Sequence, residues 1–355
     1  MEEMEDNALD RDARIKLSIG TRKPGNADGS FRNPIGLAFD NHRGRLYVAD
    51  GHNHRVQVFS CDDDDGGSFV SKFGEEGDQP GQFKYPLGLA IDNDHDRILI
   101  VDRGNARVQV WSLSKQSFLS CVGQRGSGDL EFNNPQGIAI DKHHHRIIVV
   151  DSGNNRLVFL SFISLSFLFS VGGTQGYPSR EFNYPQGIAI DDRHRIIVSD
   201  SFNHRVQVLS LIDGSFLFEF GSQGRYFGEF NGPQGVCIAN QGRIIVADAN
   251  RRLQSFTHEG RCILSFDCGS EYPYAVAFAE HRGLIAFTAN HRVHVIGANQ
   301  WLADTKFVWR PDLHRYAPSW MKQAISMMTM IRSLVDESAM SMIPNELLFE
   351  IFSFL

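Results

Sequence analysis

One repeated segment constrains the fold of this chain more than any other feature. Its clearest copy runs over residues 132–172, and the triplet Pro-x-Gly within it recurs along the chain. The prolines of five copies are separated by 52, 49, 50 and 48 residues, and they stand at Pro34, Pro86, Pro135, Pro185 and Pro233. A sixth copy begins at Pro273, where Tyr274 and Ala275 replace the usual pair. Repeats of this period are typical of propellers, solenoids and other arrays.

Each copy carries the signature of four short strands. In the fourth copy, apolar stretches over 188–190, 195–199, 206–209 and 216–220 are separated by polar turns, a pattern that predicts an antiparallel blade. The sixth copy, over 274–297, lacks a fourth strand, whereas residues 14–20 alternate strictly and end in glycine as a fourth strand does. We therefore expect an all-β, six-bladed β-propeller of four-stranded antiparallel blades, closed by the N-terminal strand. Closure removes the exposed sheet edges that invite aggregation.

Composition narrows the class further. Hydrophobic residues make up 42% of the chain and 27 are phenylalanine, which is enough to fill a large core. The formal net charge of −7 argues against binding nucleic acid over the whole surface. The cysteines number five and form no Cys-x-x-Cys pair, so we expect reduced thiols. The acidic start lacks the plan of a signal peptide, and the apolar run 157–171 is too short and serine-rich to span a membrane. These features predict a cytoplasmic protein.

Two motifs within the copies resemble a known family. They are the opening Phe-x-x-Pro-x-Gly-Ile-Ala-Ile-Asp and the turn Asp-x-x-Asn-His-Arg-Val-Gln-Val-Phe over residues 50–59. Both resemble NHL repeats, and the resemblance covers residues 14–297. WD40 and kelch repeats fit less well, because neither a repeated Trp-Asp nor a repeated Gly-Gly strand is present. The resemblance implies a propeller that recognises a protein or peptide, or in some members RNA.

The pattern predicts four regions. Residues 1–13 form an acidic, disordered N-terminus, 14–297 the NHL-type propeller, 298–318 a linker and 319–355 a C-terminal pair of helices. In the second helix Pro344 lies in the first turn, a favourable position for proline. Its sequence resembles the opening helix of an F-box, which implies docking to a ubiquitin ligase through its apolar face. That face comprises Leu347, Leu348, Ile351, Phe352 and Leu355. A helix pair that caps the propeller or forms a dimer is the alternative.

The most repeated polar residues are predicted to be structural. An aspartate ends the second strand and an arginine follows four or five residues later in five blades, which no enzyme requires. We expect buried ion pairs, with an asparagine holding each turn. The pairs are Asp50 and Arg55, Asp102 and Arg107, Asp151 and Arg156, Asp200 and Arg205, and Asp248 and Arg252.

The residues that vary between copies are the candidates for binding. Because strands alternate in direction, the loops between blades and the turns before these arginines must open on one face. Arginine interleaved with aromatic residues is common in recognition sites for peptides and for single-stranded RNA, although scattered surface residues would look the same. The candidates on this face are Arg22, Lys23, Glu75, Glu76, Arg103, Arg125, Tyr177, Arg180, Phe202, Arg225, Tyr226, Phe227 and Arg251.

Metal and cofactor sites are not expected. His54, His204 and His291 recur at one turn position, but Ala106 and Asn155 stand there in other blades. A zinc site needs three protein ligands with further residues that orient them. The aspartates at 62–65 lack the spacing of a calcium loop, and His143, His144 and His145 belong to a polar turn. No nucleophile elbow, phosphate loop or zinc-protease motif is present.

The sequence therefore predicts a protein-interaction propeller without catalytic activity, with its C-terminal helices linked to ubiquitination. The alternatives are an RNA-binding propeller and, less favoured, a metal-dependent propeller hydrolase or lyase.

Overall fold

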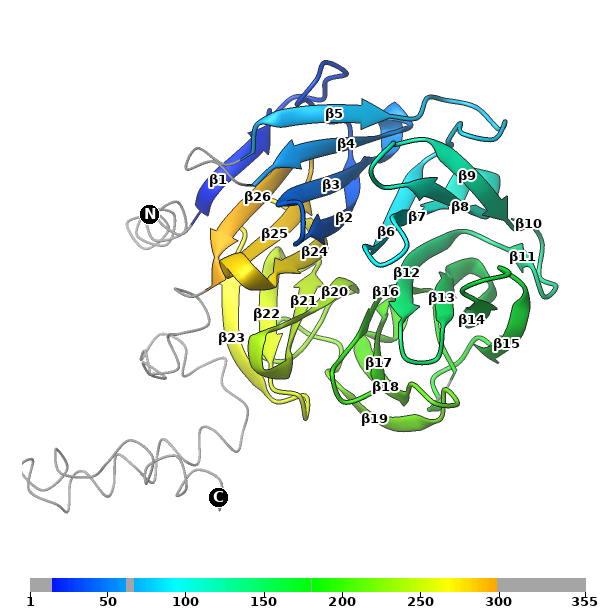
Figure 1. Cartoon of the computed structure of the whole chain (residues 1–355). Coiled ribbons are helices and arrows are strands. Elements are labelled where there is room, and N and C mark those ends of the chain that lie inside the picture. The colour runs from blue at the N-terminus through cyan, green and yellow to red at the C-terminus, as the bar shows by residue number, and fades with distance from the viewer. Residues whose placement is uncertain (1–14, 62–66, 180, 299–355) are drawn as a thin grey trace, which may run out of the picture. The chain divides into compact units, whose positions relative to one another are not determined.

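Six four-stranded antiparallel sheets, arranged as blades around one axis, make up the described part of the chain (Figure 1). The structure is a computed structural model, and it describes residues 15–61, 67–179 and 181–298. The predicted propeller of four-stranded blades is thus confirmed. The blades are numbered 1 to 6 from the proline that opens each one.

The strands occupy equivalent places in every blade. The first strands are β2 (Pro34–Asp40), β6 (Pro86–Asp92), β12 (Pro135–Asp141), β16 (Pro185–Ile190), β20 (Pro233–Ala239) and β24 (Pro273–Ala279). The second strands are β3 (Arg45–Asp50), β7 (Arg97–Asp102), β13 (Arg146–Asp151), β17 (Arg195–Asp200), β21 (Arg243–Asp248) and β25 (Leu284–Ala289). The third strands are β4 (Arg55–Ser60), β8 (Arg107–Ser112), β14 (Arg156–Ser161), β18 (Arg205–Ser210), β22 (Arg252–Phe256) and β26 (Arg292–Gly297). The fourth strands are β5 (Phe69–Phe73), β9 (Phe118–Val122), β15 (Phe167–Gly172), β19 (Phe216–Phe220), β23 (Cys262–Asp267) and β1 (Ile15–Gly20).

The N-terminal strand closes the ring. β1 pairs antiparallel with β26, with Ile19 opposite Val293, so that blade 6 takes its fourth strand from the start of the chain. Residue 14, predicted to begin this strand, lies outside the described residues. The apolar run 157–171 divides between β14 and β15, as expected for two strands.

The repeated Pro-x-Gly triplet belongs to the innermost strands. First strands of neighbouring blades contact one another around the axis (Figure 1). A Cβ atom on Gly137 would lie 2.4 Å from the carbonyl oxygen of Gln186 in the next blade, and one on Gly88 would lie 2.3 Å from that of Gln136. Only glycine permits such an approach of two backbones, which explains why the triplet recurs.

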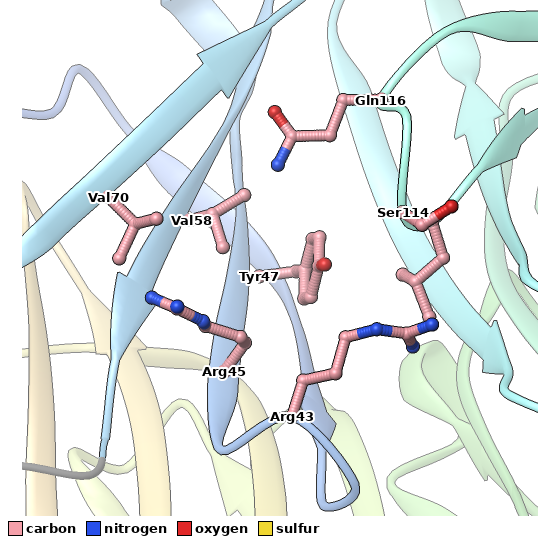
Figure 2. Close-up of a pocket in the computed structure, with 8 residues that line it drawn as sticks. Arg43, Arg45, Tyr47, Val58, Val70, Ser114 and Gln116 are labelled. Atoms are coloured by element: carbon pink, nitrogen blue, oxygen red, sulfur yellow. The ribbon is translucent and has the colours of Figure 1, made fainter.

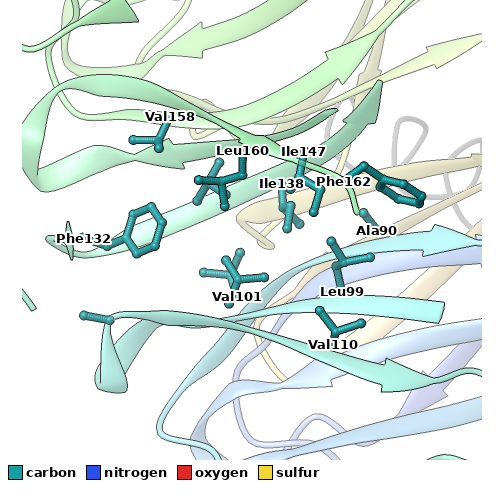
Figure 3. Close-up of a cluster of buried hydrophobic side chains, with 13 residues drawn as sticks. Ala90, Leu99, Val101, Val110, Phe132, Ile138, Ile147, Val158, Leu160 and Phe162 are labelled. Atoms are coloured by element: carbon teal, nitrogen blue, oxygen red, sulfur yellow. The ribbon is translucent and has the colours of Figure 1, made fainter. Parts of the chain in front are cut away.

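The core consists of clusters between successive blades. One of them joins blades 2 and 3 and includes Val101, Val110, Phe132, Ile147 and Leu160 (Figure 3). The phenylalanine three residues before each of the first five prolines is fully buried in these layers: Phe31, Phe83, Phe132, Phe182 and Phe230. Burial of such large side chains between blades stabilises the ring as a whole.

Short elements complete the connections. The turns between second and third strands contain the 3-10 helices η1 (Gly51–Asn53), η2 (Arg103–Asn105), η3 (Ser152–Asn154) and η4 (Ser201–Asn203). On the other end lie η5 (Asn240–Gly242) and η6 (Glu280–Arg282), and the pair β10 (Gln124–Arg125) and β11 (Glu131–Phe132) lies in one interblade loop. We call the end that carries the interblade loops and the turns η1–η4 the loop face, and the other end the opposite face.

Several predicted segments lie outside the described residues. They are the acidic N-terminus, the aspartates at 62–65, the linker and the helix pair with Leu347, Leu348, Ile351, Phe352 and Leu355.

Candidate functional site

A buried ion pair in each of five blades holds the loop face in place. In blade 2 the carboxylate of Asp102 accepts hydrogen bonds from Arg107 Nε, Asn105 Nδ2, Gln109 Nε2 and the backbone N–H of Lys84, at 2.7–3.0 Å. The two terminal nitrogens of Arg107 donate to three carbonyl oxygens of the preceding interblade loop at 2.8–2.9 Å. A fully satisfied buried network of this kind makes the loop a rigid platform.

The same network recurs around the ring. The five aspartates are fully buried, and each accepts from an arginine Nε at 2.8–2.9 Å: Asp50 from Arg55, Asp102 from Arg107, Asp151 from Arg156, Asp200 from Arg205 and Asp248 from Arg252. The asparagine of each turn donates to this aspartate and to a carbonyl of the incoming loop, as Asn53 does to Asp50 and to Gly25. These side chains are therefore engaged in supporting the fold.

Blade 6 builds the network from different residues. Ala289 stands where the aspartate would be, and the carboxylate comes from Glu271 in the preceding loop. Glu271 pairs with Arg292 and, at 2.5 Å, with His294 Nε2. His294 Nδ1 is in turn 2.7 Å from the hydroxyl oxygen of Ser18 on β1. The closing strand is thus tied into the ring by side chains as well as by its backbone.

The recurring histidines connect neighbouring blades. The ring Nδ1 of His54 accepts a hydrogen bond from the backbone N–H of Tyr85 at 3.2 Å, and His204 accepts one from Gly232 at 3.0 Å. His291 accepts in the same way from Asn33 at 3.2 Å. Each ring thus bonds the residue before the proline of the next blade. Among the described residues, no group of three or more His, Cys, Asp or Glu side chains is arranged to hold a metal ion.

That position before the proline carries three tyrosines on alternate blades. Tyr85, Tyr184 and Tyr272 open blades 2, 4 and 6, whereas Asn33, Asn134 and Gly232 open blades 1, 3 and 5. Because the first strands are innermost, the tyrosines surround the propeller axis at the loop face.

Two of these tyrosines have an unfavourable backbone conformation. Tyr85 and Tyr184 have φ angles of 52° and 53°, in the left-handed region. Asparagine and glycine adopt this region readily, whereas a bulky side chain there costs about 1 kcal/mol. Strained residues often occur at functional sites, so the tyrosines are candidates for binding.

Aromatic and cationic side chains meet around these tyrosines. Tyr184 stacks on Phe202, with ring centroids 5.0 Å apart, and its hydroxyl lies 3.4 Å from a terminal nitrogen of Arg103. The guanidinium carbon of Arg251 lies 4.7 Å from the centre of the Tyr272 ring. Such cation–π contacts occur in many recognition surfaces.

The third tyrosine contacts two histidines. Tyr85 meets the rings of His52 and His54 edge-on, with centroids 5.1 and 5.0 Å apart. Burial lowers the pKa of His52, and the nearby Arg32 lowers it further. His52 therefore favours its neutral form beside Tyr85.

Exposed aromatic side chains gather on the loop face. Among the described residues, the strongly exposed aromatics are Tyr85, Tyr177, Phe202, Tyr226 and Tyr272, and all of them belong to interblade loops or to the η4 turn. The exposed aliphatic side chains lie mostly elsewhere, as Leu119, Leu168 and Leu217 do on fourth strands. An aromatic surface supported by a rigid frame is suited to binding another molecule.

The residues proposed from the sequence divide into three groups. Exposed on the loop face are Arg22, Lys23, Glu75, Glu76, Arg125, Tyr177, Phe202, Arg225, Tyr226 and Arg251. Arg103 and Phe227 are half-buried there, and Arg180 lies outside the described residues. The structure brings Arg103 and Phe202 together through Tyr184. Sequence reasoning missed the three tyrosines, although Tyr-Pro at the start of alternate copies was a visible signal.

Comparison with protein families agrees with this architecture. The NHL repeat model matches residues 31–59, 182–209 and 230–252, and a model described as a 6-bladed beta-propeller matches residues 96–171. The fold and these matches define the chain as a six-bladed propeller that contains NHL repeats. No helix among the described residues is long and apolar enough to cross a bilayer.

Several known proteins match part of this chain. Rat E3 ubiquitin-protein ligase NHLRC1 is 35% identical over 88 residues, which are 25% of this chain and 21% of the ligase. Peptidyl-glycine alpha-amidating monooxygenase B of Xenopus laevis is 35% identical over 92 residues, 24% of this chain and 10% of that protein. Protein brain tumor of Drosophila melanogaster is 33% identical over 86 residues, 24% and 8% of the two chains. Each match thus spans less than a quarter of the relative.

Solved structures share the fold. A gluconolactonase from Xanthomonas campestris superposes with a TM-score of 0.57 at 15% identity, covering 75% of this chain and 86% of that one. A catalytically inactive virginiamycin B lyase from Staphylococcus aureus gives 0.52 at 13% identity, covering 75% and 84%. At these identities the likeness concerns the fold, and function must be argued from the site.

Proposed function

We propose that this chain is a protein-interaction propeller without catalytic activity, whose loop face binds a protein or peptide partner. The observation that carries the proposal is the gathering of the exposed aromatic side chains on the loop face, with Tyr85, Tyr184 and Tyr272 around the axis. Tyrosine supplies a large contact area at a low entropic cost, and arginine beside it adds directional hydrogen bonds.

The engagement of the other polar residues also supports a binding role. The recurring aspartates and arginines support the interblade loops, and the recurring histidines accept backbone hydrogen bonds from the next blade. Most of the candidate residues that remain for an external ligand are aromatic or cationic, a composition suited to recognition, and Glu75 and Glu76 are the acidic ones.

We further propose that the bound partner is a substrate for ubiquitination. Similarity to NHLRC1, an E3 ubiquitin-protein ligase, supports this link, and so does the resemblance of the C-terminal sequence to the first helix of an F-box. In this arrangement the propeller selects the substrate and Leu347, Leu348 and Ile351 dock to the ligase. If deletion of residues 343–355 leaves every ligase component bound, the docking half of the proposal fails.

Substitution of the three tyrosines by asparagine tests the loop face. Asparagine occupies the same position at Asn33 and Asn134 and adopts the left-handed region, so the triple variant Tyr85→Asn, Tyr184→Asn, Tyr272→Asn should fold. Quantitative affinity capture from cells should show that partners bound by the natural chain are lost from this variant. Retention of every partner would refute the proposal.

A matched control carries three substitutions on the outer strands. Leu119→Ser, Leu168→Ser and Leu217→Ser remove three exposed apolar side chains from fourth strands instead of the loop face. This variant should still bind the partners of the natural chain. Capture is repeated after nuclease treatment and at raised salt. Loss of the partners under both conditions would indicate RNA instead, because phosphate contacts weaken steeply with ionic strength.

A further inference from the structure

On the opposite face, an arginine at the start of the second strand links neighbouring blades. In blades 2, 3 and 4 its guanidinium bonds the aspartate from the end of the first strand. The same guanidinium donates to a backbone carbonyl in the turn between the third and fourth strands of the next blade. The pairs are Arg97 with Phe162, Arg146 with Ile212 and Arg195 with His258, at 3.5, 3.0 and 2.9 Å.

Blade 1 departs from this arrangement. Its aspartate, Asp40, is bonded by Arg43 at 3.1 Å, and Arg43 also reaches Asp96 in blade 2 at 2.9 Å. Arg45 is the arginine at the start of this second strand, and it makes no side-chain hydrogen bond or ion pair with any residue that the structure describes. Within the described ranges, two carboxylates therefore accept from Arg43, whereas none accepts from Arg45.

A pocket lies where the missing interblade contact would be. It has a volume of about 240 Å³ and lies between blades 1 and 2, with Arg43, Arg45 and Tyr47 among its lining residues. Figure 2 shows Tyr47 at the centre of this set, with Arg45 on one side of it and Arg43 on the other. Val58 and Leu113, both almost fully buried, supply apolar walls.

Tyr47 is a second departure from the repeat. Its counterparts are aliphatic: Leu99, Ile148, Ile197, Ile245 and Ala286. The side chain is 2% exposed, and its hydroxyl forms no hydrogen bond within the described part of the chain. Burial and the nearby Asp40 raise the pKa of Tyr47 to about 12, so the hydroxyl remains a donor at neutral pH. Because Tyr47 lines the pocket, its hydroxyl is available to donate to an acceptor bound there.

We propose that this pocket binds a carboxylate carried on a short apolar group. The guanidinium of Arg45, which pairs with no carboxylate among the described residues, and the hydroxyl of Tyr47 would hold the two oxygens, while Val58 and Leu113 contact the apolar part. The two arginines lie beside two carboxylates, Asp40 and Asp96, so the site carries no excess positive charge and favours a monoanion over a dianion such as phosphate. The volume is smaller than the roughly 300–1,000 Å³ of drug-sized ligand sites, which suits a group the size of one amino acid.

Two probes that differ only in charge test the proposal. N-acetyl-leucine carries the carboxylate and N-acetyl-leucinamide does not, so calorimetric titration of the full chain should show the acid binding at least roughly tenfold more tightly. Arg45→Gln should abolish the preference for the acid. Tyr47→Phe, which removes only the hydroxyl, should weaken binding of the acid by a smaller factor. Equal binding of acid and amide, or an unchanged preference in Arg45→Gln, would overturn the proposal.

Two further measurements complete the experiment. Arg103→Gln alters the loop face, so it should leave the affinity for N-acetyl-leucine unchanged and separates this site from the proposed function. The titrations are repeated with the aspartates at 62–65 replaced by serine, which removes the four negative charges that follow Cys61 in the sequence. This variant should keep or strengthen the preference for the acid, and loss of the preference in it would also refute the proposal.

The source of the carboxylate is decided with two more ligands. Binding of 4-methylpentanoate as tight as that of N-acetyl-leucine indicates a small free acid, whereas tighter binding of an acetylated tripeptide that ends in leucine indicates the C-terminus of a protein. Failure of both to bind would overturn the assignment.

Discussion

Removal of one arginine from the buried ion pairs that support the loop face should strongly destabilise the folded protein. Asp151 is fully buried, and Arg156, which is 8% exposed, donates to it at 2.9 Å. In Arg156→Ala the carboxylate keeps only the backbone N–H of Asn133 and the side-chain amide of Asn154. Breaking a buried ion pair by removing one partner costs roughly 3–5 kcal/mol, so we expect a loss of about 3 kcal/mol in the free energy of unfolding.

The repeat supplies an internal comparison. In blade 2 a glutamine, Gln109, donates to the equivalent carboxylate of Asp102 at 3.0 Å, whereas Val158 occupies that position in blade 3. Arg107→Ala should therefore leave its carboxylate better satisfied and cost less than Arg156→Ala, by about the 1 kcal/mol of one hydrogen bond.

Urea unfolding followed by circular dichroism measures both variants, and pH adds a second readout. Burial already raises the pKa of Asp151, and loss of Arg156 should raise it further. Because the folded state then binds a proton more tightly than the unfolded state, the deficit of Arg156→Ala should shrink as pH falls through the raised pKa toward that of an unfolded aspartate, about 3.9. A loss below about 1 kcal/mol, or a deficit no larger than that of Arg107→Ala, would refute the reasoning.

A double substitution separates the two sources of the cost. Asp151→Asn combined with Arg156→Gln removes both charges and should recover part of the stability lost in Arg156→Ala, if the stranded carboxylate is responsible. No recovery would instead assign the cost to the carbonyl groups of Gly128 and Glu131, which Arg156 also bonds.

Three other predictions concern single residues. Gly137→Ala should lower stability by about 2 kcal/mol in the same unfolding assay, because the new Cβ would lie 2.4 Å from the carbonyl oxygen of Gln186; an unchanged midpoint would contradict the close approach of inner strands. Because the pKa of Tyr47 is raised to about 12, unfolding between pH 10 and 12 exposes a phenol that ionises; the natural chain should lose on the order of 2–3 kcal/mol more than Tyr47→Phe across this range, and equal losses would contradict the shift. In a reaction with Ellman's reagent, the exposed Cys121 should give the fastest kinetic phase, because burial raises the pKa of thiols such as Cys237 and slows their reaction. The variant Cys121→Ser should lack this fast phase, and its persistence would contradict the prediction.

The fold could be predicted from the sequence because one interaction pattern is used repeatedly. Pro-x-Gly marks inner strands that approach too closely for a side chain, as at Gly137, and the phenylalanine before it fills the space between blades, as Phe132 does. The unpaired alternating segment at the N-terminus matched the strand missing from blade 6, which made closure predictable as well.

The candidate site was only partly predictable. The loop face was predicted from the alternating direction of the strands, and the comparison of copies separated the repeated residues from the variable ones. The importance of Tyr85 and Tyr184 did not, because their left-handed backbone conformation is a property of the folded loop. The role of His54 as an acceptor for the next blade also depends on a contact between residues 31 positions apart.

The pocket beside Arg45 on the opposite face was not predicted from the sequence, for a different reason. Arg45 begins its strand as Arg97 does, so the sequence pattern alone makes the two look equivalent. The difference arises because Arg43, in the preceding turn, bonds Asp40 and leaves Arg45 without that partner. Small departures from a repeat therefore acquire meaning only when the contacts of each copy are compared.

Cross-linking of a bound partner to lysines tests the central claim, that the loop face is the recognition surface, most directly. Lys23 and Lys84 lie on the loop face, whereas Lys115 and Lys142 lie in turns on the opposite face. Mass spectrometry of the cross-linked complex should find the partner joined to Lys23 and Lys84. Cross-links confined to Lys115 and Lys142 would contradict the claim.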